Sequence, residues 1–286
     1  VGTSERLKSW ILSHRPDLTS KSFFVAYCPE RVLPGNIVYE LIMNDRIVGG
    51  VDDQSTQKAV RFYKTFTKGN VLTSNSRTAE LAKLSENSYR DVNIAFANEL
   101  NEICEKLNID IWRLLHLTNM HPRVNILRPG PGVGGHCIAV DPWFIVDSAK
   151  DESKLIALAR EVNDDKPNKV VDKILPEINK FKLKNIACLG LSYKANVDDI
   201  RESPSLKIVS LLAEKINARI YAVEPNISSL PISLLKNNIV LSTLENALEK
   251  ADCIVILVEH KEFLELAKIN LGAKKVFDIC GLFDVH

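Results

Sequence analysis

The sequence has no excess of charge of either sign. Its 286 residues include 37 Lys and Arg against 36 Asp and Glu, which gives a formal net charge of +1. This balance argues against a nucleic-acid partner, because such proteins usually carry a basic excess, although it leaves room for a local basic pocket that binds phosphate. With 45% hydrophobic and 26% charged residues, we expect an ordinary globular protein of about two domains.

Long apolar runs and closely spaced cysteine pairs are also missing. No run is long enough to cross a bilayer, so we expect no membrane span. The six cysteines are irregularly spaced and form no Cys-x-x-Cys pair, which argues against a metal site or a disulfide scaffold and favours a reducing cytoplasm. Cys188, Cys253 and Cys280 lie in apolar runs and Cys104 in a helical pattern, so we expect these four to be buried.

A dinucleotide-binding turn is missing as well. No Gly-x-Gly-x-x-Gly motif follows a predicted strand and opens a helix, as such a turn would require. The first residue is Val1, and Val1-Gly2-Thr3-Ser4-Glu5 has the pattern of a strand end followed by a helix cap. The sequence therefore predicts that the chain begins inside a domain.

The most informative segment is the glycine-rich run that surrounds Cys137. Gly132, Gly134 and Gly135 can adopt positive φ and carry no side chain, so a ligand can approach the backbone beside the thiol. His136 and Asp141 add titratable groups near this possible nucleophile. The alternative is a tight turn around a small buried cysteine.

Residues 1–163 predict an α/β segment followed by helices. We expect a helix near Glu5–His14 and another at Ser55–Phe66, with short strands at Phe23–Tyr27, Ile47–Gly50 and Val71–Leu72. Apolar residues from Arg77 to Leu107 recur at three-and-four spacing, which predicts one helix of about 45 Å that bridges domains or pairs with a partner subunit. Shorter helices are expected at Ile111–Thr118 and Ala157–Asn163.

The remainder, entered at Asp164–Pro167, alternates short apolar runs with helical patterns. The expected strands are Ile186–Leu191, Ile220–Val223, Ile239–Leu241, Ile254–Val258 and Lys275–Ile279, and the helices are Ser205–Ile216 and Leu244–Ala251. This alternation predicts a doubly wound parallel sheet. The loop Gly190–Pro204 leaves the first strand at the edge where nucleotides usually bind. Glu224 after the next strand either holds a ribose hydroxyl or is simply solvated.

Five segments, in this order, together resemble the UDP-glucose/GDP-mannose dehydrogenase family, and the resemblance covers nearly the whole chain. They are Cys28-Pro-Glu-Arg-Val-Leu-Pro-Gly35, Glu80-Leu-Ala-Lys-Leu-Ser-Glu-Asn87, Asn98-Glu-Leu100, Gly130–Phe144 and Asp199-Ile-Arg-Glu-Ser203. The resemblance implies an α/β fold in three parts. These are the remnant of an N-terminal NAD-binding Rossmann-like domain (residues 1–75), a central helical and dimerisation region (76–163) and a C-terminal UDP-sugar-binding Rossmann-like domain (164–286).

The resemblance also implies an NAD-dependent, four-electron oxidation of a sugar C6 alcohol to a carboxylate. Cys137 matches the nucleophile, which adds to the intermediate aldehyde and passes through a thiohemiacetal and a thioester. Lys83 and Asn87 lie one helical turn apart, where both could reach one oxyanion or one water, unless they only form a solvated helix face. Asp141 resembles the carboxylate that activates the hydrolytic water, with a turn-forming role as the alternative, and Glu30 matches a carboxylate near the reacting sugar.

Further residues match positions that bind the substrate. Arg123 resembles an arginine that reaches the neighbouring subunit's substrate across a dimer, with a surface salt bridge as the alternative. Lys194 and Arg201 match positions that bind the nucleotide sugar, and Arg201 is also expected near the cofactor, unless it only pairs with Asp198 or Asp199. Gly132, Gly134 and Gly135 complete the expected substrate-binding set.

The substrate is expected to be a UDP-N-acetylhexosamine. Pro34 stands where members acting on UDP-glucose have a second glutamate. Ile138–Phe144 and Val223–Asn226 most resemble members that oxidise UDP-N-acetyl-D-mannosamine to UDP-N-acetyl-D-mannosaminuronate. The alternatives are UDP-GlcNAc, UDP-GalNAc or UDP-glucose as substrate, or, because most of the cofactor domain is expected to be missing, an inactive UDP-binding or dimerisation fragment.

Overall fold

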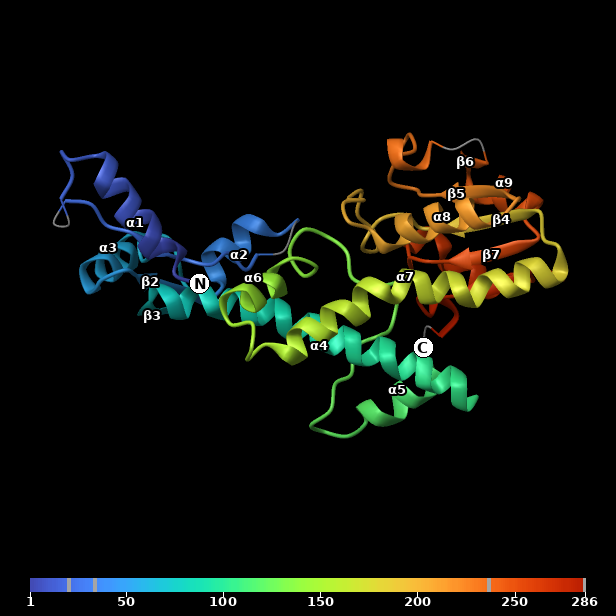
Figure 1. Cartoon of the computed structure of the whole chain (residues 1–286), viewed down its shortest axis with the longest axis horizontal. Helices are drawn as coiled ribbons and strands as arrows, with labels where there is room; N and C mark the ends of the chain where they lie inside the picture. Colours follow the sequence, from blue (N-terminus) through green and yellow to red (C-terminus); the bar gives the residue numbers. More distant parts are fainter. Residues whose placement is uncertain (20–21, 33–34, 236–237, 285–286) are drawn as a thin grey trace. The chain divides into compact units, whose positions relative to one another are not determined.

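The computed structural model describes residues 1–19, 22–32, 35–235 and 238–284 (Figure 1). The chain divides into two compact units, Val1–Ser88 with Trp143–Ser153 and Tyr89–Pro142 with Lys154–His286. The domain boundaries expected after residues 75 and 163 stay predictions. Pro34, on which the expected substrate branch depends, lies outside the described residues.

Unit 1 contains a small sheet with strand order β1-β2-β3. Strand β2 (Arg46–Gly50) runs parallel to β3 (Val71–Asn75), and helix α3 (Asp53–Tyr63) connects them. Strand β1 is shorter than expected, with only Ala26–Tyr27 paired, antiparallel to β2. The N–H of Val25, which precedes it, donates to the Ser55 hydroxyl at 3.2 Å, while the Val25 carbonyl oxygen accepts the N–H of Val51 at 3.0 Å.

The other helices of unit 1 are tied to this sheet and to one another. Helix α1 (Thr3–His14) begins where the carboxylate of Glu80 accepts hydrogen bonds from the N–H groups of Gly2 and Ser4 at 2.5 and 2.8 Å. Such a carboxylate satisfies helix N–H groups that have no partner in the helix itself. Helix α2 (Ile37–Met43) was not expected from the sequence.

Helix α4 (Ser76–Leu107) follows β3 directly and is the long helix that the apolar spacing predicts. Helices α5 (Ile111–Asn119) and α6 (Asp141–Ser148) follow, and α6 was not expected. Helix α7 (Lys154–Phe181) continues through Pro167, so the helix end expected at Asn163 is wrong. Its buried side chains repeat at helical spacing on both sides of Pro167, and this packing outweighs the helix-breaking tendency of proline.

Unit 2 contains a five-stranded parallel sheet, as expected, and its strand order is β6-β5-β4-β7-β8. Its strands are β4 (Asn185–Leu189), β5 (Arg219–Val223), β6 (Ile239–Leu241), β7 (Cys253–Ile256) and β8 (Lys275–Asp278). Alternate residues of the strands belong to two cores, because successive side chains point to opposite faces of a sheet.

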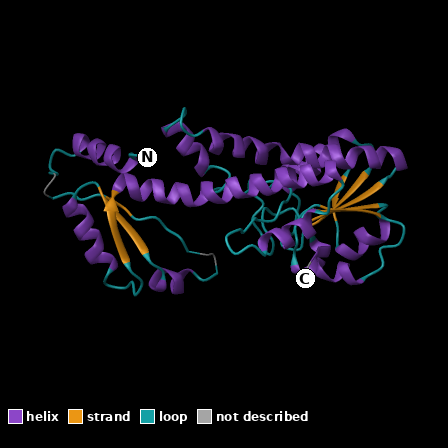
Figure 2. Cartoon of the chain, turned by 90° about the horizontal axis from the view of Figure 1, so that it is seen from below, coloured by secondary structure: helices purple, strands orange, loops and turns teal. Residues whose placement is uncertain are grey.

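Helices cover both faces of this sheet (Figure 2). One core includes residues of α7 and α8 (Pro204–Lys215), and the other includes residues of α9 (Leu244–Lys250) and of the 3-10 segment η2 (Lys261–Lys268). This arrangement confirms the doubly wound α/β fold. Two short 3-10 turns, η1 (Ile232–Leu234) and η3 (Leu282–Asp284), complete the unit. Over the described residues, no helix is long and apolar enough to span a membrane.

Candidate active site

The glycine-rich loop packs tightly against the segment 193–204. Gly132 and Gly135 have φ values of 133° and 80°, which side chains other than hydrogen disfavour. A Cβ atom at Gly134 would lie 2.6 Å from the carbonyl oxygen of Glu202, and one at Gly135 would lie 3.0 Å from the Tyr193 ring. The glycines are therefore required for close packing, and the expected contact with a ligand stays a prediction.

Cys137 is exposed at the end of this loop. Its carbonyl oxygen accepts hydrogen bonds from the N–H groups of Val140 at 3.0 Å and Asp141 at 2.8 Å. Asp141 is the first residue of α6 and Pro142 is buried behind it. The thiol therefore sits at the entry to a helix, with Asp141 one turn away along the backbone.

Arg201 and Asp199, in the segment 193–204, interact electrostatically with Cys137 and His136. The Arg201 guanidinium pairs with both carboxylate oxygens of Asp199, with the shortest contact at 2.6 Å. Hydrogen bonds from Arg201 lower the pKa of Asp199 to about 2, and His136 contributes electrostatically. Asp199 is the main cause of the raised pKa of Arg201, with small contributions from Tyr193 and Cys137. The structure thus brings Cys137, His136 and Arg201 together within unit 2.

The expected pairing of Arg201 with an aspartate is present, and its binding roles stay predictions. Its side chain is 65% exposed, so the guanidinium remains accessible to a ligand. Lys194 is also exposed in the same segment. Its carbonyl oxygen accepts a hydrogen bond from the Ser192 hydroxyl at 2.7 Å, which fixes the backbone while leaving the ammonium group free to reach outward.

Glu224, which follows β5, is deeply buried instead of solvated. One carboxylate oxygen accepts hydrogen bonds from the N–H groups of Leu191 and Ser192 at 2.7 and 3.0 Å and lies 3.0 Å from His260 Nε2. The other accepts from the backbone and side chain of Asn226. These partners satisfy both oxygens, so Glu224 holds the strand ends together and is not free to bind a ribose.

The remaining predicted catalytic residues belong to unit 1. Lys83 and Asn87 occupy successive turns of α4, where Lys83 is half-buried and Asn87 buried. Glu30 is held by its own turn, because one carboxylate oxygen accepts from the N–H groups of Arg31 and Val32 at 2.8 and 3.2 Å. Its other oxygen lies 3.5 Å from the buried Arg46 guanidinium. The site is therefore described in two parts, one in each unit.

Arg123 lies exposed in the turn after α5. Its backbone N–H donates to His121 Nδ1 at 3.3 Å. Its guanidinium takes part in none of the ion pairs observed among the described residues, and the alternative of a surface salt bridge stays a prediction. Its expected role at a neighbouring subunit stays a prediction.

Sequence reasoning missed the supporting residues of the loop. The Asn98 side chain accepts a hydrogen bond from the N–H of Gly130 at 3.0 Å and donates one to Asn163 Oδ1 at 3.0 Å. For Asn98 the only signal was that it belongs to Asn98-Glu-Leu100, one of the segments that carry the family resemblance. Asn163 was predicted only as the last residue of a helix. Tyr193, whose ring covers Gly135, gave no signal because it lies in an irregular loop.

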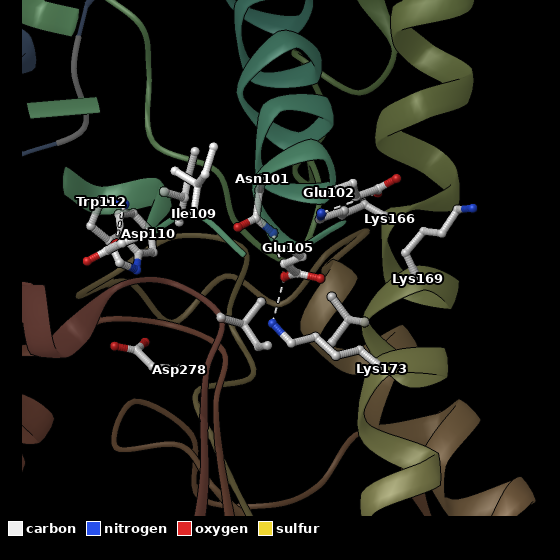
Figure 3. Close-up of a pocket in the computed structure, with 13 residues that line it drawn as sticks. Asn101, Glu102, Glu105, Ile109, Asp110, Trp112, Lys166, Lys169, Lys173 and Asp278 are labelled. Atoms are coloured by element: carbon white, nitrogen blue, oxygen red, sulfur yellow. Dashed lines mark hydrogen bonds and ion pairs between the residues drawn. The ribbon is translucent and has the colours of Figure 1, made fainter. Parts of the chain in front are cut away.

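A separate cavity of about 210 Å³ lies between α4, α5 and α7 of unit 2. Figure 3 shows ion pairs among its lining residues, with Lys173 Nζ at 2.6 Å from Glu105 and the buried Lys166 at 3.4 Å from Glu102. Burial lowers the pKa of Lys166. No predicted site residue lines the cavity. In the described parts of the chain, no group of three or more His, Cys, Asp or Glu residues could hold a metal.

The end of β2 and the start of α3 in unit 1 do not fit the pyrophosphate of NAD. The two glycines that end β2 are used for packing, because a Cβ atom at Gly49 or Gly50 would lie 2.3 Å from Asn75 O or Thr56 N. The following helix, α3, begins with Asp52, whose carboxylate already accepts the N–H of Ser55 at 2.7 Å. An anion at this helix end would meet a carboxylate instead of free N–H groups.

Comparisons with known proteins match the whole length of the chain. The UDP-glucose/GDP-mannose dehydrogenase family is matched by its NAD binding domain over residues 1–67, its central domain over residues 77–165 and its UDP binding domain over residues 187–285. The UDP-N-acetyl-D-mannosamine dehydrogenase of Campylobacter jejuni is 52% identical over 93% of this chain and 67% of the relative. The NDP-N-acetyl-D-galactosaminuronic acid dehydrogenase of Ralstonia nicotianae is 47% identical over 99% of this chain and 68% of the relative.

A solved structure agrees with these matches. The UDP-D-ManNAc dehydrogenase of Pyrococcus horikoshii superimposes with a TM-score of 0.86 at 34% identity, over 98% of this chain and 66% of that protein. The chain thus spans about two thirds of the length of its relatives. It belongs to the UDP-glucose/GDP-mannose dehydrogenase family, a family of NAD-dependent dehydrogenases of sugar nucleotides.

Proposed function

We propose that this chain carries the nucleophile and the nucleotide-sugar domain of a UDP-N-acetyl-D-mannosamine 6-dehydrogenase. The observation that carries the proposal is the exposed Cys137 thiol beside Arg201, on a loop packed against the segment that contains Lys194. The 52% identity with the Campylobacter jejuni enzyme supports the mannosamine substrate. The 47% identity with the Ralstonia nicotianae enzyme makes the galactosamine epimer the second candidate.

The reaction converts the C6 alcohol into a carboxylate, and the family's cofactor NAD accepts the two hydrides. Cys137 acts between the two oxidations, where its thiolate adds to the C6 aldehyde and the oxygen takes up a proton, so that a thiohemiacetal forms. After the second oxidation the sugar is held as a thioester. Water adds to this thioester, the C–S bond breaks, and the carboxylate leaves while the thiol is regenerated. Covalent capture prevents the aldehyde from escaping.

The other residues receive roles that suit their chemistry. Lys83 and Asn87 donate hydrogen bonds to the oxyanion that develops at C6, since a cation and an amide one helical turn apart can share one acceptor. Asp141 orients the hydrolytic water, and Glu30 assists near the sugar. Lys194 and Arg201 bind the pyrophosphate, while Gly132, Gly134 and Gly135 present backbone to the substrate.

We also propose a homodimer formed through α4. This helix exposes large apolar side chains at regular spacing, with exposed fractions of 69% for Tyr89, 52% for Phe96, 44% for Ile103 and 60% for Leu107. Three of these four lie seven residues apart, the spacing of a helix-pairing seam. In such a dimer Arg123 contributes to the partner's substrate site.

Turnover with a panel of sugar nucleotides tests the proposed activity. The chain is incubated with NAD and UDP-ManNAc, UDP-GalNAc, UDP-GlcNAc or UDP-glucose, and NADH and uronate are measured. We expect the highest rate with UDP-ManNAc and no uronate from Cys137→Ala. A higher rate with UDP-GalNAc would make the galactosamine epimer the proposed substrate. Uronate formation by Cys137→Ala would show that Cys137 is not the nucleophile.

A binding experiment separates the active enzyme from the inactive fragment. NAD and UDP are titrated separately into the chain by calorimetry. Binding of both supports an enzyme, whereas binding of UDP without NAD supports the inactive UDP-binding module. This experiment is required because the turn from β2 into α3 does not form a pyrophosphate cradle.

A further inference from the structure

A line of buried side-chain amides connects helices α4 and α7 to the loop that carries Cys137. Asn98 on α4 donates its amide N–H to Asn163 Oδ1 on α7 at 3.0 Å. The carbonyl oxygen of the Asn98 amide accepts the backbone N–H of Gly130 at 3.0 Å. Asn98 is 0% exposed and Asn163 is 1% exposed, so water does not compete for these bonds.

The orientation of both amides is determined by Asp91. Asn163 Nδ2 donates to the Asp91 carboxylate at 2.8 Å and to its backbone oxygen at 3.0 Å. A carboxylate only accepts, so Asn163 must turn its nitrogen toward Asp91 and its oxygen toward Asn98. Asn98 must then turn its nitrogen toward Asn163, which leaves its oxygen for the N–H of Gly130. The polarity of each amide follows from the one before it.

The acceptor that sets this polarity is itself held by a buried cation. Arg160 Nη1 on α7 donates to Asp91 Oδ1 at 2.6 Å, and the side chains are 1% and 0% exposed. Burial raises the pKa of Asp91, although Arg160 and Asn163 oppose this shift. Burying such a pair costs desolvation energy, and removing either partner leaves an uncompensated buried charge. The Asp91 acceptor that Arg160 holds in place sets the direction of the amide line.

The loop that carries Cys137 makes a second contact, this time with helix α7, at Gly132. A Cβ atom at Gly132 would lie 3.1 Å from the backbone oxygen of Asn163. Pro167 has no N–H to donate to that oxygen within α7, and the glycine backbone packs there. The second half of the loop is held elsewhere, because the N–H of Gly135 donates to the Arg201 backbone oxygen at 3.2 Å.

We infer that Asn98 and Asn163 are positioning residues for the nucleophile Cys137. They fix the backbone of the first half of its loop through neutral, directional hydrogen bonds that originate at the buried Asp91–Arg160 pair. The inference rests on the proposed function for the role of Cys137. Asn98 and Asn163 do not touch the substrate in this proposal. Their substitution changes the position of the loop backbone that carries the Cys137 thiol.

Hydrogen exchange followed by mass spectrometry tests the inference on the chain itself. Asn98→Leu removes both amide bonds at nearly constant volume. We expect protection of residues 130–137 to fall about tenfold or more, as for the loss of a buried hydrogen bond, while strands β4–β8 keep theirs. The matched control is Asn238→Leu, because the Asn238 amide donates to Ala213 O at 3.1 Å in the same unit. This control should leave residues 130–137 unchanged.

Two results would overturn the inference. Unchanged protection of residues 130–137 in Asn98→Leu would show that the amide line does not hold the loop. An equal loss of protection in the loop and in strands β4–β8 would show a role in general stability only. Asn163→Leu is the second variant if Asn98→Leu does not fold, and the same loop-limited loss is expected.

A conservative variant at the same position gives a pH-dependent result that a general loss of stability would not produce. In Asn98→Asp, the protonated carboxyl group has both the donor and the acceptor of the amide, whereas the ionised form has no donor for Asn163. The charged groups near this position are Lys166, whose Nζ lies 3.3 Å from the Asn98 backbone oxygen, and its partner Glu102. Beyond Asn163 lie the Asp91–Arg160 pair and Asp164, which also pairs with Arg160. Lys166 favours the ionised form and burial favours the protonated form.

Loop protection in Asn98→Asp, measured relative to the unsubstituted chain at each pH, should therefore recover as the pH is lowered. Protection that does not depend on pH would overturn the directional role of Asn98. The nucleophile itself is tested by uronate formation in Cys137→Ala, which does not depend on loop exchange. Failure of the inference and failure of the proposed function are thus seen in different variants.

Discussion

Among the residues, Cys137 differs from the other five cysteines in its surroundings. Cys188 and Cys253 are fully buried, Cys104 is 2% exposed, and Cys28 and Cys280 are half-buried, whereas Cys137 is exposed. Apolar neighbours in the sequence predicted the first three correctly. Cys280 is less buried than expected, and it lies two residues after the end of β8.

This difference predicts selective alkylation of Cys137. Burial raises the pKa of Cys253 to about 12 and raises the pKa values of Cys28, Cys104, Cys188 and Cys280, and only the thiolate reacts. Limited treatment of the folded chain with iodoacetamide, followed by peptide mass spectrometry, should find Cys137 modified first. Earlier modification of Cys188 or Cys253 would contradict the structure.

Glu224 shows a second residue whose surroundings decide its role. The sequence shows that Glu224 follows a predicted strand. It does not show that His260, 36 residues later, forms a hydrogen bond with it. Burial alone raises the pKa of Glu224, but hydrogen bonds from His260, Leu191 and Ser192 outweigh it and lower the pKa to about 2. The ionised carboxylate is therefore the form that stabilises the folded chain.

We predict that Glu224→Gln lowers the free energy of unfolding by about 3 kcal/mol at neutral pH, because folding lowers the pKa of Glu224 from 4.5 to about 2. Because the folded pKa is depressed, this stabilisation is complete above pH 4.5 and is lost as the pH falls toward 2. Urea unfolding between pH 7 and pH 3 measures it. Glu249→Gln, at an exposed position in α9, is the control and should change little; a similar loss in both variants would refute the prediction.

Among the elements, those with a long periodic apolar pattern were predicted well, whereas short or interrupted helices were not. The start of α4 lies within one residue of the expected position, because its apolar spacing continues over many turns. The five strands of unit 2 were expected because each is a short apolar run between helical patterns. Helix α2 has seven residues and α6 has eight, which is too short for a period to be recognised.

Helix α7 shows why a local rule failed. Asp164-Asp-Lys-Pro167 has the composition of a helix end, yet the helix continues to Phe181. Arg160, Asn163 and Val170 are buried on one side of it, and their partners on α4 and in the sheet are distant in sequence. The energy that keeps the helix intact is tertiary, so a single sequence does not reveal it.

For α4 we predict that Phe96→Asp weakens the homodimer about tenfold or more, because an unpaired carboxylate would have to leave water. Sedimentation equilibrium or light scattering over a range of concentrations measures the effect. Phe181→Asp is a matched control, since Phe181 at the end of α7 is 53% exposed against 52% for Phe96, and it should leave the dimer unchanged. A chain that is monomeric at micromolar concentration would contradict the proposed dimer.

On the scale of the whole molecule, the predicted catalytic residues are divided between two compact units. Cys137, Asp141 and Arg201 lie in unit 2, whereas Glu30, Lys83 and Asn87 lie in unit 1. The resemblance to a family predicted all six, because motif matching does not require knowledge of their contacts. The supporting contacts of Asn98, Asn163 and Tyr193 needed coordinates, since each connects segments more than 30 residues apart.

For the whole molecule we predict that nucleotide affinity and sugar discrimination are separable. Uridine and pyrophosphate offer many fixed donors and acceptors, whereas the candidate sugars differ by an epimer or an acetamide. Calorimetry should show similar affinities for UDP and UDP-ManNAc, and Lys194→Ala should weaken both about tenfold. Lys268→Ala, which only breaks an exposed pair with Glu265, is the control. No binding of UDP at millimolar concentration would overturn this assignment.

The packing of the glycine loop limits how this protein can be diversified. At Gly134 any side chain would collide with a backbone carbonyl at 2.6 Å, whereas nothing lies within 4 Å of a Cβ atom at Gly130. Gly130 contributes only its backbone N–H, which every residue except proline also has. A saturation library screened for activity should therefore return a wide range of residues at position 130 and only glycine at position 134, although the two glycines are four residues apart in one motif.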